Sequence, residues 1–246
     1  RHLEESRALG VKEYYFTGGE PFLNRDLPAI LEETLRLGPA TVLTNGTVLR
    51  DGLVSNLARI ARESRYSLEI RVSIDGHESA INDALRGEGT FEAAMRGVEV
   101  LTAAGFLPII TVVQTWSDDA TEEVLRRLAE ELRRRGCSRP RIKLLPVLRM
   151  GMEVSRTRGY YPEERITRDM LATYDAGRLL CSHGRTVTDR GVAVCPILIE
   201  APGAHLGTSL QESLVPFAVT HAACYTCYLH GAICSNAAAA SPGADR

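Results

Sequence analysis

No stretch of this sequence approaches the roughly 18 consecutive apolar residues of a membrane-spanning helix, so no membrane-spanning segment is expected. Neither sign of charge dominates, because 29 Lys and Arg residues nearly balance 31 Asp and Glu residues. A dedicated nucleic-acid binder is therefore disfavoured. No secretory signal-peptide pattern, Ser-centred nucleophile elbow or phosphate-binding glycine loop is visible. Cysteine is absent before Cys137, so the 246 residues, 44% of them hydrophobic, must form their core without a chain-wide disulfide framework.

The first two-thirds of the chain alternates short apolar strands with amphipathic helices. Helices are expected to begin near Asp26, Asp51, Thr90 and Asp118. Five strand–helix alternations predict an α/β fold with a parallel sheet, either open or curved into a full or partial barrel. The expected strands cover residues 11–17, 41–44, 68–74, 107–114 and 141–145.

The third expected strand, residues 68–74, has two unlike faces. Side chains alternate between the faces of a strand, which puts Ile70, Val72 and Ile74 on one side. The opposite side carries Glu69, Arg71, Ser73 and, just beyond the strand, Asp75. Because a strand of an open, doubly covered parallel sheet is usually apolar on both faces, this pattern favours a barrel with a polar interior.

Three short motifs follow expected strands, where a parallel sheet collects ligand-binding groups. Gly18 and Gly19 would let the backbone approach a ligand closely, and Glu20 would suit a cationic amine, although an ordinary strand-to-helix turn is an equal alternative. The segment 44–46, Thr-Asn-Gly, is either a binding loop or a plain turn. Asp75 could accept hydrogen bonds from ribose hydroxyls and Ser73 could bond a carboxylate, with a helix or loop cap as the alternative.

Five of the six cysteines lie at position 181 or later and predict a metal site. The spacing Cys224-x2-Cys227 presents two thiolates to one metal, and two more cysteines would complete a tetrahedral set. Cys181, Cys195 and Cys234 are the remaining candidates. Disulfides are disfavoured because nothing suggests secretion, and the spacing does not separate zinc from an iron–sulfur cluster. It also leaves open which four of the five are ligands.

Together these pieces resemble the radical SAM (S-adenosylmethionine) superfamily, and most clearly its members with a C-terminal auxiliary iron–sulfur domain of the SPASM or twitch type. The motifs are the segments 16–23, 44–46 and 73–76, the Arg86-Gly87 pair and the late cysteines. The resemblance implies a partial (β/α)6 barrel of parallel strands in residues 1–150, with its first β/α unit missing. The residue pattern itself predicts a linker at 151–177 with a short helix at 167–176, a Cys-rich segment at 178–235 and a disordered tail at 236–246. The resemblance implies that the Cys-rich segment is an auxiliary cluster domain.

The same resemblance assigns roles to residues. Gly18, Gly19 and Glu20 would bind the methionyl amine of S-adenosylmethionine, Asp75 its ribose, and Ser73, together with Arg86, its carboxylate. Cys181, Cys195, Cys224 and Cys227 would hold an auxiliary 4Fe–4S cluster. Only Cys234 then remains, so one auxiliary cluster is expected rather than two.

One family feature is absent from this sequence. The Cys-x3-Cys-x2-Cys motif that holds the catalytic 4Fe–4S cluster should precede Gly18, so its ligands are expected upstream of Arg1 in a longer protein. The expected reaction is cleavage of S-adenosylmethionine to a 5′-deoxyadenosyl radical, which abstracts a hydrogen from a peptide or protein side chain, or from a small molecule. A flavodoxin or ferredoxin would be the reductant, and a cytoplasmic location is expected because exposed clusters need a reducing compartment. The alternatives are a zinc-stabilised barrel without radical chemistry and a degenerate partner that recruits a peptide; no catalytic residue is assigned.

Overall fold

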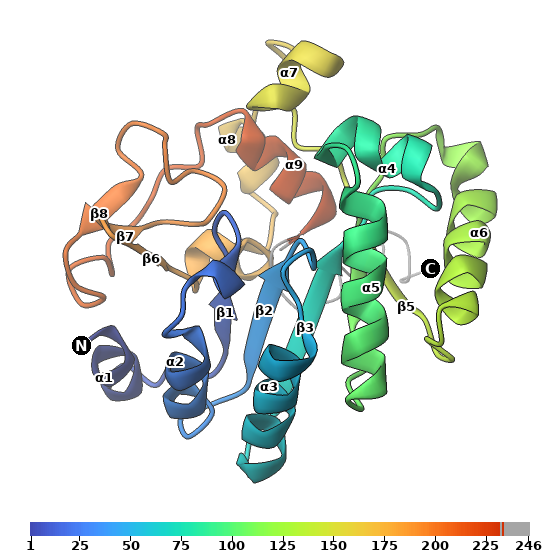
Figure 1. Cartoon of the computed structure of the whole chain (residues 1–246). Coiled ribbons are helices and arrows are strands. Elements are labelled where there is room, and N and C mark those ends of the chain that lie inside the picture. The colour runs from blue at the N-terminus through green and yellow to red at the C-terminus, as the bar shows by residue number, and fades with distance from the viewer. Residues whose placement is uncertain (232, 234–246) are drawn as a thin grey trace. The chain divides into compact units, whose positions relative to one another are not determined.

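The computed structural model describes residues 1–231 and residue 233, and the chain divides into two compact units. Gly10–Leu145 forms one unit, which we call the sheet unit. Arg1–Leu9 and Pro146–Arg246 form the other, the C-terminal unit. Each unit is described by itself below, with the elements labelled as in Figure 1.

The sheet unit is built on five parallel strands in the order β1-β2-β3-β4-β5. The order follows the chain, as expected for successive right-handed strand–helix units. In residues 10–145 the sheet stays open, so the predicted α/β fold with a partial parallel barrel is confirmed in its strands and their order. The strands are β1 (Tyr14–Phe16), β2 (Ala40–Thr44), β3 (Leu68–Ser73), β4 (Ile109–Val113) and β5 (Arg141–Leu145).

Helices of the sheet unit cover one face of the sheet, as Figure 1 shows for α2, α3, α5 and α6. Four begin within three residues of the expected positions, but Asp26 does not cap α2 with its side chain. The helix α4 was not expected, because its eight residues are too few for a clear apolar period. The helices are α2 (Leu27–Thr34), α3 (Asp51–Glu63), α4 (Ser79–Arg86), α5 (Thr90–Ala103) and α6 (Thr121–Arg134).

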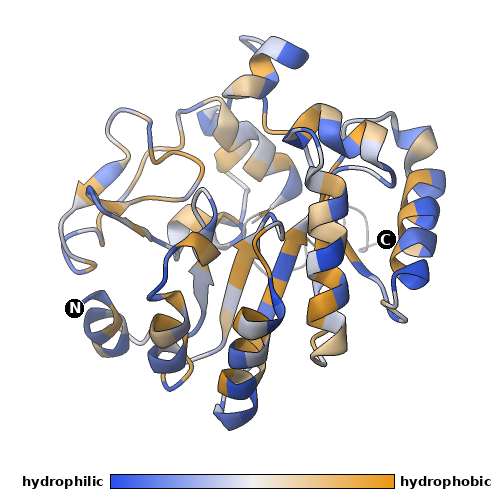
Figure 2. Cartoon of the chain, viewed as in Figure 1, coloured by the Kyte–Doolittle hydropathy of each residue, from blue (hydrophilic) through white to orange (hydrophobic). Residues whose placement is uncertain are grey.

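The core of the sheet unit lies between the strands and these helices. Ile70, Val72 and Ile74 are at most 1% exposed and belong to this core, which confirms the apolar face predicted for β3. Figure 2 shows orange together with white or blue on β2 and β3, and mostly blue on the outer sides of α3 and α6. Burial of each large aliphatic side chain contributes about 1.5–3 kcal/mol, so the register of the strands is set by this face.

The opposite face of the sheet is polar along β3 and its neighbours. The strand register pairs Thr41 with Glu69, and it aligns Ser73 with Thr111 and Lys143. Arg71 is 2% exposed on this face and its Nε donates to Glu69 at 3.1 Å. The prediction of a polar inner face is therefore confirmed.

The C-terminal unit combines short helices with a small antiparallel sheet of order β6-β7-β8. This sheet was not predicted, since strands of three residues show no periodicity. The short helix expected at 167–176 is only four residues long. None of the helices within the described residues is long and apolar enough to cross a membrane. The elements are α1 (His2–Ala8), α7 (Met152–Arg156), α8 (Arg168–Leu171), β6 (Thr186–Thr188), β7 (Gly191–Ala193), β8 (His205–Gly207) and α9 (Ala223–His230).

The first helix belongs to the C-terminal unit through specific contacts. Glu5 of α1 accepts a hydrogen bond from the backbone N–H of Leu210 at 2.9 Å, and the guanidinium of Arg1 donates to the carbonyl of Thr208. The Leu210 bond is the main reason that the pKa of Glu5 is lowered. Contacts between residues far apart in the sequence thus hold this unit together.

Candidate functional site

A loop of residues 17–20, here called the glycine loop, follows β1 at the carboxyl end of the sheet. Gly18 has φ = +149°, a conformation that L side chains rarely adopt, and no atom lies within 4 Å of where a Cβ would be at Gly18 or Gly19. The loop lines an open hollow of about 230 Å³ together with residues of η1 (Pro21–Leu23) and α2. The peptide groups of both glycines are therefore accessible to a ligand.

The carboxylate of Glu20 ties the glycine loop to the end of β2. Its Oε1 accepts hydrogen bonds from Thr44 Oγ1 at 2.7 Å and Phe22 N at 3.1 Å, and its Oε2 accepts one from Asn45 N at 2.8 Å. Three donors thus occupy most of the carboxylate's acceptor capacity. The sequence indicated a carboxylate at the mouth of the site but not this bracing role, which depends on contacts across 24 and 25 positions.

The loop after β2 is held by close packing against α5. Gly46 has φ = +76°, and a Cβ there would lie 2.8 Å from Val72 Cγ1. Gly97 of α5 approaches the same loop so closely that its Cβ would lie 2.4 Å from the carbonyl oxygen of Gly46. Asn45 receives a hydrogen bond on its Oδ1 from Thr47 N at 2.9 Å, which fixes the turn. The structure therefore forms a packed turn in which glycine is required at both contact points.

At the end of β3 the structure brings Asp75 and Arg86 together. Asp75 is 6% exposed, and its Oδ1 accepts a hydrogen bond from Val113 N at 2.8 Å while its Oδ2 lies 2.8 Å from Arg86 Nη2. Ser73 Oγ lies 3.1 Å from Thr111 Oγ1 on the neighbouring strand. The two residues expected to contact different parts of a ligand, Asp75 and Arg86, are partners of each other in this structure.

The guanidinium of Arg86 retains an unused donor. Its Nε is buried and has no hydrogen-bond partner among the residues that the structure describes. A buried donor without a partner costs about 1–3 kcal/mol, which a bound carboxylate would recover. The donor chemistry at this position therefore fits the carboxylate end of an amino acid.

Asn82 and Asp83, which were not singled out from the sequence, fix the end of β3 in place. Asn82 Oδ1 accepts a hydrogen bond from Asp75 N at 3.0 Å, and Asn82 Nδ2 donates to Asp83 Oδ1 at 3.1 Å. Asp83 also accepts hydrogen bonds from Gly89 N and Phe91 N, both at 2.8 Å, across the turn between α4 and α5. The hydrogen bond from Asn82, followed by that from Phe91 N, lowers the pKa of Asp83. Two adjacent polar residues a few positions before a glycine-containing turn were the available signal.

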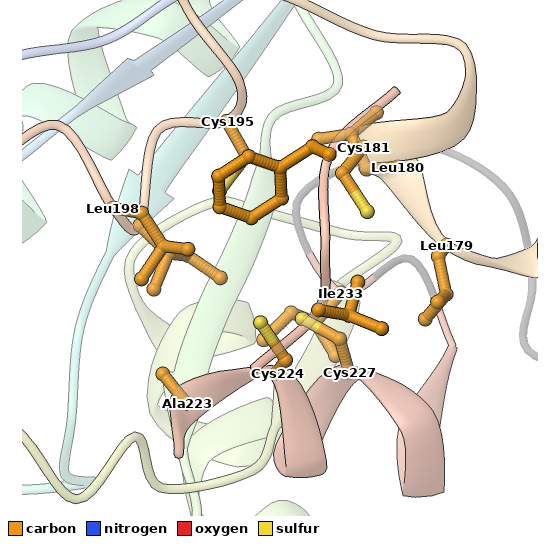
Figure 3. Close-up of a pocket in the computed structure, with 12 residues that line it drawn as sticks. Leu179, Leu180, Cys181, Cys195, Leu198, Ala223, Cys224, Cys227 and Ile233 are labelled. Carbon is orange, nitrogen blue, oxygen red and sulfur yellow. The ribbon is translucent and has the colours of Figure 1, made fainter. Parts of the chain in front are cut away.

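Four cysteines of the C-terminal unit line one apolar pocket, here called the thiol pocket. Cys224 and Cys227 extend from α9, Cys181 lies in η4 (Leu180–Ser182), and Cys195 follows β7. Figure 3 shows the sulfurs of Cys224 and Cys227 side by side on the helix, on the side toward Cys181. Apolar side chains complete the walls: Leu179, Leu180, Ile197, Leu198, Phe217, Val219, Ala223 and Ile233.

The thiols of this pocket share a low-dielectric environment. Burial raises the pKa of Cys224 to about 11, and the nearby Cys181 and Cys195 add to the rise because they would carry the same charge. Burial likewise raises the pKa of Cys195, while the backbone N–H groups of Leu198 and Ile197 oppose that rise by donating to its sulfur. Such thiols stay protonated at neutral pH unless a metal replaces the proton.

The donor set of the thiol pocket suits a thiophilic metal or an iron–sulfur cluster. Soft thiolate ligands select these groups, and an apolar wall with N–H donors to sulfur is typical of their surroundings. The described residues form no disulfide, and no three His, Cys, Asp or Glu side chains among them are already arranged around a metal position. Cys234 lies outside the described residues, so its predicted role stays a prediction. Cys137 is 2% exposed in the core of the sheet unit, as a structural thiol would be.

A family model described as the radical SAM superfamily matches residues 1–144. The chain belongs to the radical SAM superfamily. Membership confirms the resemblance drawn from the motifs and implies S-adenosylmethionine and a 4Fe–4S cluster as the cofactors of the family.

Three curated relatives resemble parts of this chain. It is 34% identical over 115 residues to the mycofactocin maturase MftC of Mycolicibacterium smegmatis, 46% of this chain and 28% of the relative. It is 30% identical over 112 residues to the PqqA peptide cyclase of Streptomyces rochei, 45% of this chain and 29% of the relative. The probable GTP 3′,8-cyclase of Methanopyrus kandleri is 31% identical over 134 residues, 54% of this chain and 41% of the relative. The matches thus span between about a quarter and two-fifths of these relatives.

Solved radical SAM structures share the fold over more of the chain. Native anSMEcpe with bound AdoMet superposes with a TM-score of 0.60 at 13% identity, covering 90% of this chain and 71% of that one. Streptococcus suis SuiB gives a TM-score of 0.58 at 14% identity, covering 89% of this chain and 59% of that one. At such low identity these structures support the fold alone.

Proposed function

We propose that this chain binds S-adenosylmethionine at the carboxyl end of its sheet and serves a radical SAM enzyme that modifies a peptide or protein side chain. The observation that carries the proposal is the glycine loop, which Glu20 holds open beside β2 while the peptide groups of Gly18 and Gly19 stay accessible. A backbone held in this way offers hydrogen bonds to a methionyl amine and carboxylate at little entropic cost.

The roles of the remaining site residues follow from their contacts. Arg86 would direct its unused Nε to the ligand carboxylate, while Asp75 keeps the guanidinium in place through Nη2. Asp75 would accept a hydrogen bond from a ribose hydroxyl, because Val113 N and Arg86 leave some lone pairs of its carboxylate free. Ser73 would contribute its hydroxyl beside Thr111. Glu20 acts mainly as a positioning residue, which differs from a direct contact with the amine.

The 4Fe–4S cluster of the family supplies, when bound, the electron that cleaves S-adenosylmethionine to a 5′-deoxyadenosyl radical. No cysteine precedes Cys137 in this sequence, so residues 1–136 provide no thiolate for that cluster. The chain's own contribution is to bind and orient S-adenosylmethionine.

In the C-terminal unit we assign the thiol pocket to an auxiliary 4Fe–4S cluster. Cys181, Cys195, Cys224 and Cys227 would be its ligands, because they line one apolar pocket and burial disfavours leaving their thiolates without a metal. A ferredoxin or flavodoxin would act as the external reductant. The cytoplasm would keep such a cluster reduced.

The substrate class rests on the relatives. Two of them are named as a peptide cyclase and a maturase, which supports a peptide or protein side chain as the substrate. The GTP cyclase relative supports a small molecule as the alternative. Formation of 5′-deoxyadenosine by the full gene product, measured anaerobically with and without a candidate peptide, separates these two classes.

Binding of S-adenosylmethionine tests the glycine loop directly. We expect Gly18→Ala to weaken binding roughly tenfold or more, because a Cβ strains the loop and enters the hollow. Gly105→Ala is the matched control, since Gly105 also has a positive φ (+90°) and open space around its Cβ position but lies after α5. Equilibrium dialysis with labelled S-adenosylmethionine gives both affinities, and equal affinities would contradict the proposal.

The absence of cysteine before Cys137 favours a second candidate, a zinc-stabilised protein without radical chemistry or a degenerate partner that recruits a peptide. Anaerobic purification followed by assays of iron, sulfide and zinc separates the candidates. About four irons and four sulfides per chain support the auxiliary cluster. One zinc per chain in a colourless protein supports the second candidate.

A further inference from the structure

Arg185 follows the thiol pocket's Cys181 by four positions and folds back onto the backbone of the same turn. Its Nη1 donates to the carbonyl oxygens of Cys181 at 2.9 Å and Gly184 at 2.7 Å. Its Nε donates to the carbonyl oxygen of Ser213 at 2.8 Å, and its Nη2 to that of Val215 at 3.3 Å. One guanidinium group thereby joins two segments that lie 28 to 30 positions apart.

Both segments lead into the lining of the thiol pocket. The first contains Cys181, and the second is followed directly by Phe217 and Val219, which also line the pocket. The planar guanidinium fixes several carbonyl groups at once, which a lysine ammonium does less well. Arg185 therefore connects the backbones of both segments in the metal-free protein.

The charge of Arg185 has no carboxylate partner in the described part of the chain. All four of its hydrogen bonds end on carbonyl oxygens, and no Asp or Glu of residues 1–231 lies within 4.0 Å of its nitrogens. By contrast, Arg190 next to β7 pairs with Glu200. The guanidinium nitrogen Nη1 of Arg185 lies 2.9 Å from the carbonyl oxygen of Cys181, so the positive charge lies beside the residue that carries the thiol.

We propose that Arg185 is a positioning residue of the thiol pocket that fixes the Cys181 turn and supplies a built-in positive charge for an anionic metal–thiolate group. The inference rests on the auxiliary cluster proposed above. A 4Fe–4S cluster with four thiolate ligands carries net negative charge, and a fixed positive charge beside it raises its reduction potential. Arg185 thus serves the metal site through backbone geometry and charge, without touching the reacting atoms.

Three variants of the full chain separate the two effects. Arg185→Gln removes the charge and most donors, Arg185→Lys keeps the charge with fewer fixed donors, and Arg190→Gln is the control on the same small sheet. In metal-free protein, hydrogen exchange of residues 181–185 and 213–216 reports the backbone contacts. In anaerobically reconstituted protein, iron and sulfide content and a redox titration followed by electron paramagnetic resonance report the cluster.

We expect roughly tenfold faster exchange at both segments in Arg185→Gln, with an intermediate rate in Arg185→Lys. The midpoint potential should fall in Arg185→Gln and stay near wild type in Arg185→Lys. Complete loss of iron from Arg185→Gln with full occupancy in Arg190→Gln also supports the proposal. Unchanged exchange and unchanged potential in Arg185→Gln would overturn it. Wild-type protein that takes up no iron and sulfide overturns the auxiliary cluster itself, which is a distinct result from a cluster insensitive to Arg185.

Discussion

Replacing Glu20 by glutamine removes the charge of the side chain that joins the glycine loop to β2 and leaves its size unchanged. The carboxylate accepts three hydrogen bonds, from Thr44 Oγ1 at 2.7 Å, Asn45 N at 2.8 Å and Phe22 N at 3.1 Å. Glutamine has one acceptor oxygen, so its amide N–H group must face at least one of these donors. The variant therefore replaces an attraction by a repulsion at one position and weakens the others.

The size of the effect follows from these contacts. A hydrogen bond to a charged group contributes about 1.5–3 kcal/mol, and a neutral one about 1 kcal/mol. Losing one charged bond and reducing the other two to neutral ones should lower the free energy of unfolding by at least about 2.5 kcal/mol, which corresponds to roughly 5–10 °C in melting temperature. Binding of S-adenosylmethionine should weaken as well, because the glycine loop is no longer fixed.

A double-mutant cycle with Thr44→Val isolates the contact between the two side chains. Urea unfolding of Glu20→Gln, Thr44→Val and the double variant should give a coupling of about 1 kcal/mol or more. Glu13→Gln is the matched control, because Glu13 is exposed and accepts one hydrogen bond from Tyr15, so a change within about 0.5 kcal/mol is expected. Strictly additive effects, or a Glu20→Gln variant as stable as Glu13→Gln, would refute the bracing role.

Three further outcomes are expected. Gly97→Ala should lower the free energy of unfolding by about 1–3 kcal/mol, because its Cβ would meet a backbone carbonyl oxygen at 2.4 Å. Gly52→Ala in α3, where nothing lies within 4 Å of the Cβ position, should raise the free energy of unfolding by about 0.5–1 kcal/mol. Urea unfolding measures both. Without metal, Cys224 with its pKa of about 11 should react with iodoacetamide at pH 8 about a hundredfold more slowly than a thiol of pKa 9, and the rate should rise between pH 9 and 11. The pKa of Glu164 is lowered to about 2, chiefly by its hydrogen bonds from Arg158. The stabilising contribution of Glu164 is therefore present above pH 4.5 and lost as the pH falls toward 2. The difference in melting temperature between wild type and Glu164→Gln should shrink over that range.

Each of these outcomes has a clear contrary result. Equal stabilities of the two glycine variants would mean that α5 shifts freely away from the loop after β2. A rate for Cys224 equal to that of the urea-unfolded protein would mean that the thiol pocket does not exclude water. Equal melting temperatures of wild type and Glu164→Gln at pH 6 would mean that the Arg158 pair does not survive in solution.

The sequence predicted the ends of some strands of the sheet better than those of others. The strand 141–145 forms as predicted, because Pro140 and Pro146 mark both ends. The strand predicted at 11–17 forms only at Tyr14–Phe16, since Val11 is 38% exposed and precedes the first pairing with Ala40. Strand boundaries therefore depended on pairing register, which the apolar pattern does not contain.

The candidate site residues were named from motifs, but their hydrogen-bond partners were not. The bond from Thr44 to Glu20 and that from Val113 to Asp75 join residues 24 and 38 positions apart. Such pairings follow from the order and register of parallel strands, which local sequence does not fix. The Cys-x2-Cys spacing indicated two thiols directed to one site, yet α9 itself was missed because it lacks an apolar stripe.

The contact between Gly46 and Gly97 also has an evolutionary consequence. A Cβ at position 97 requires α5 to move away from the carbonyl oxygen of Gly46, and a Cβ at position 46 would strain its backbone and press on Val72 and on Ala94 of α5. The two positions should therefore be inherited together, or lost together, among proteins that share this sheet. The residues at these two positions would then indicate, for each such protein, how closely α5 packs against the loop after β2.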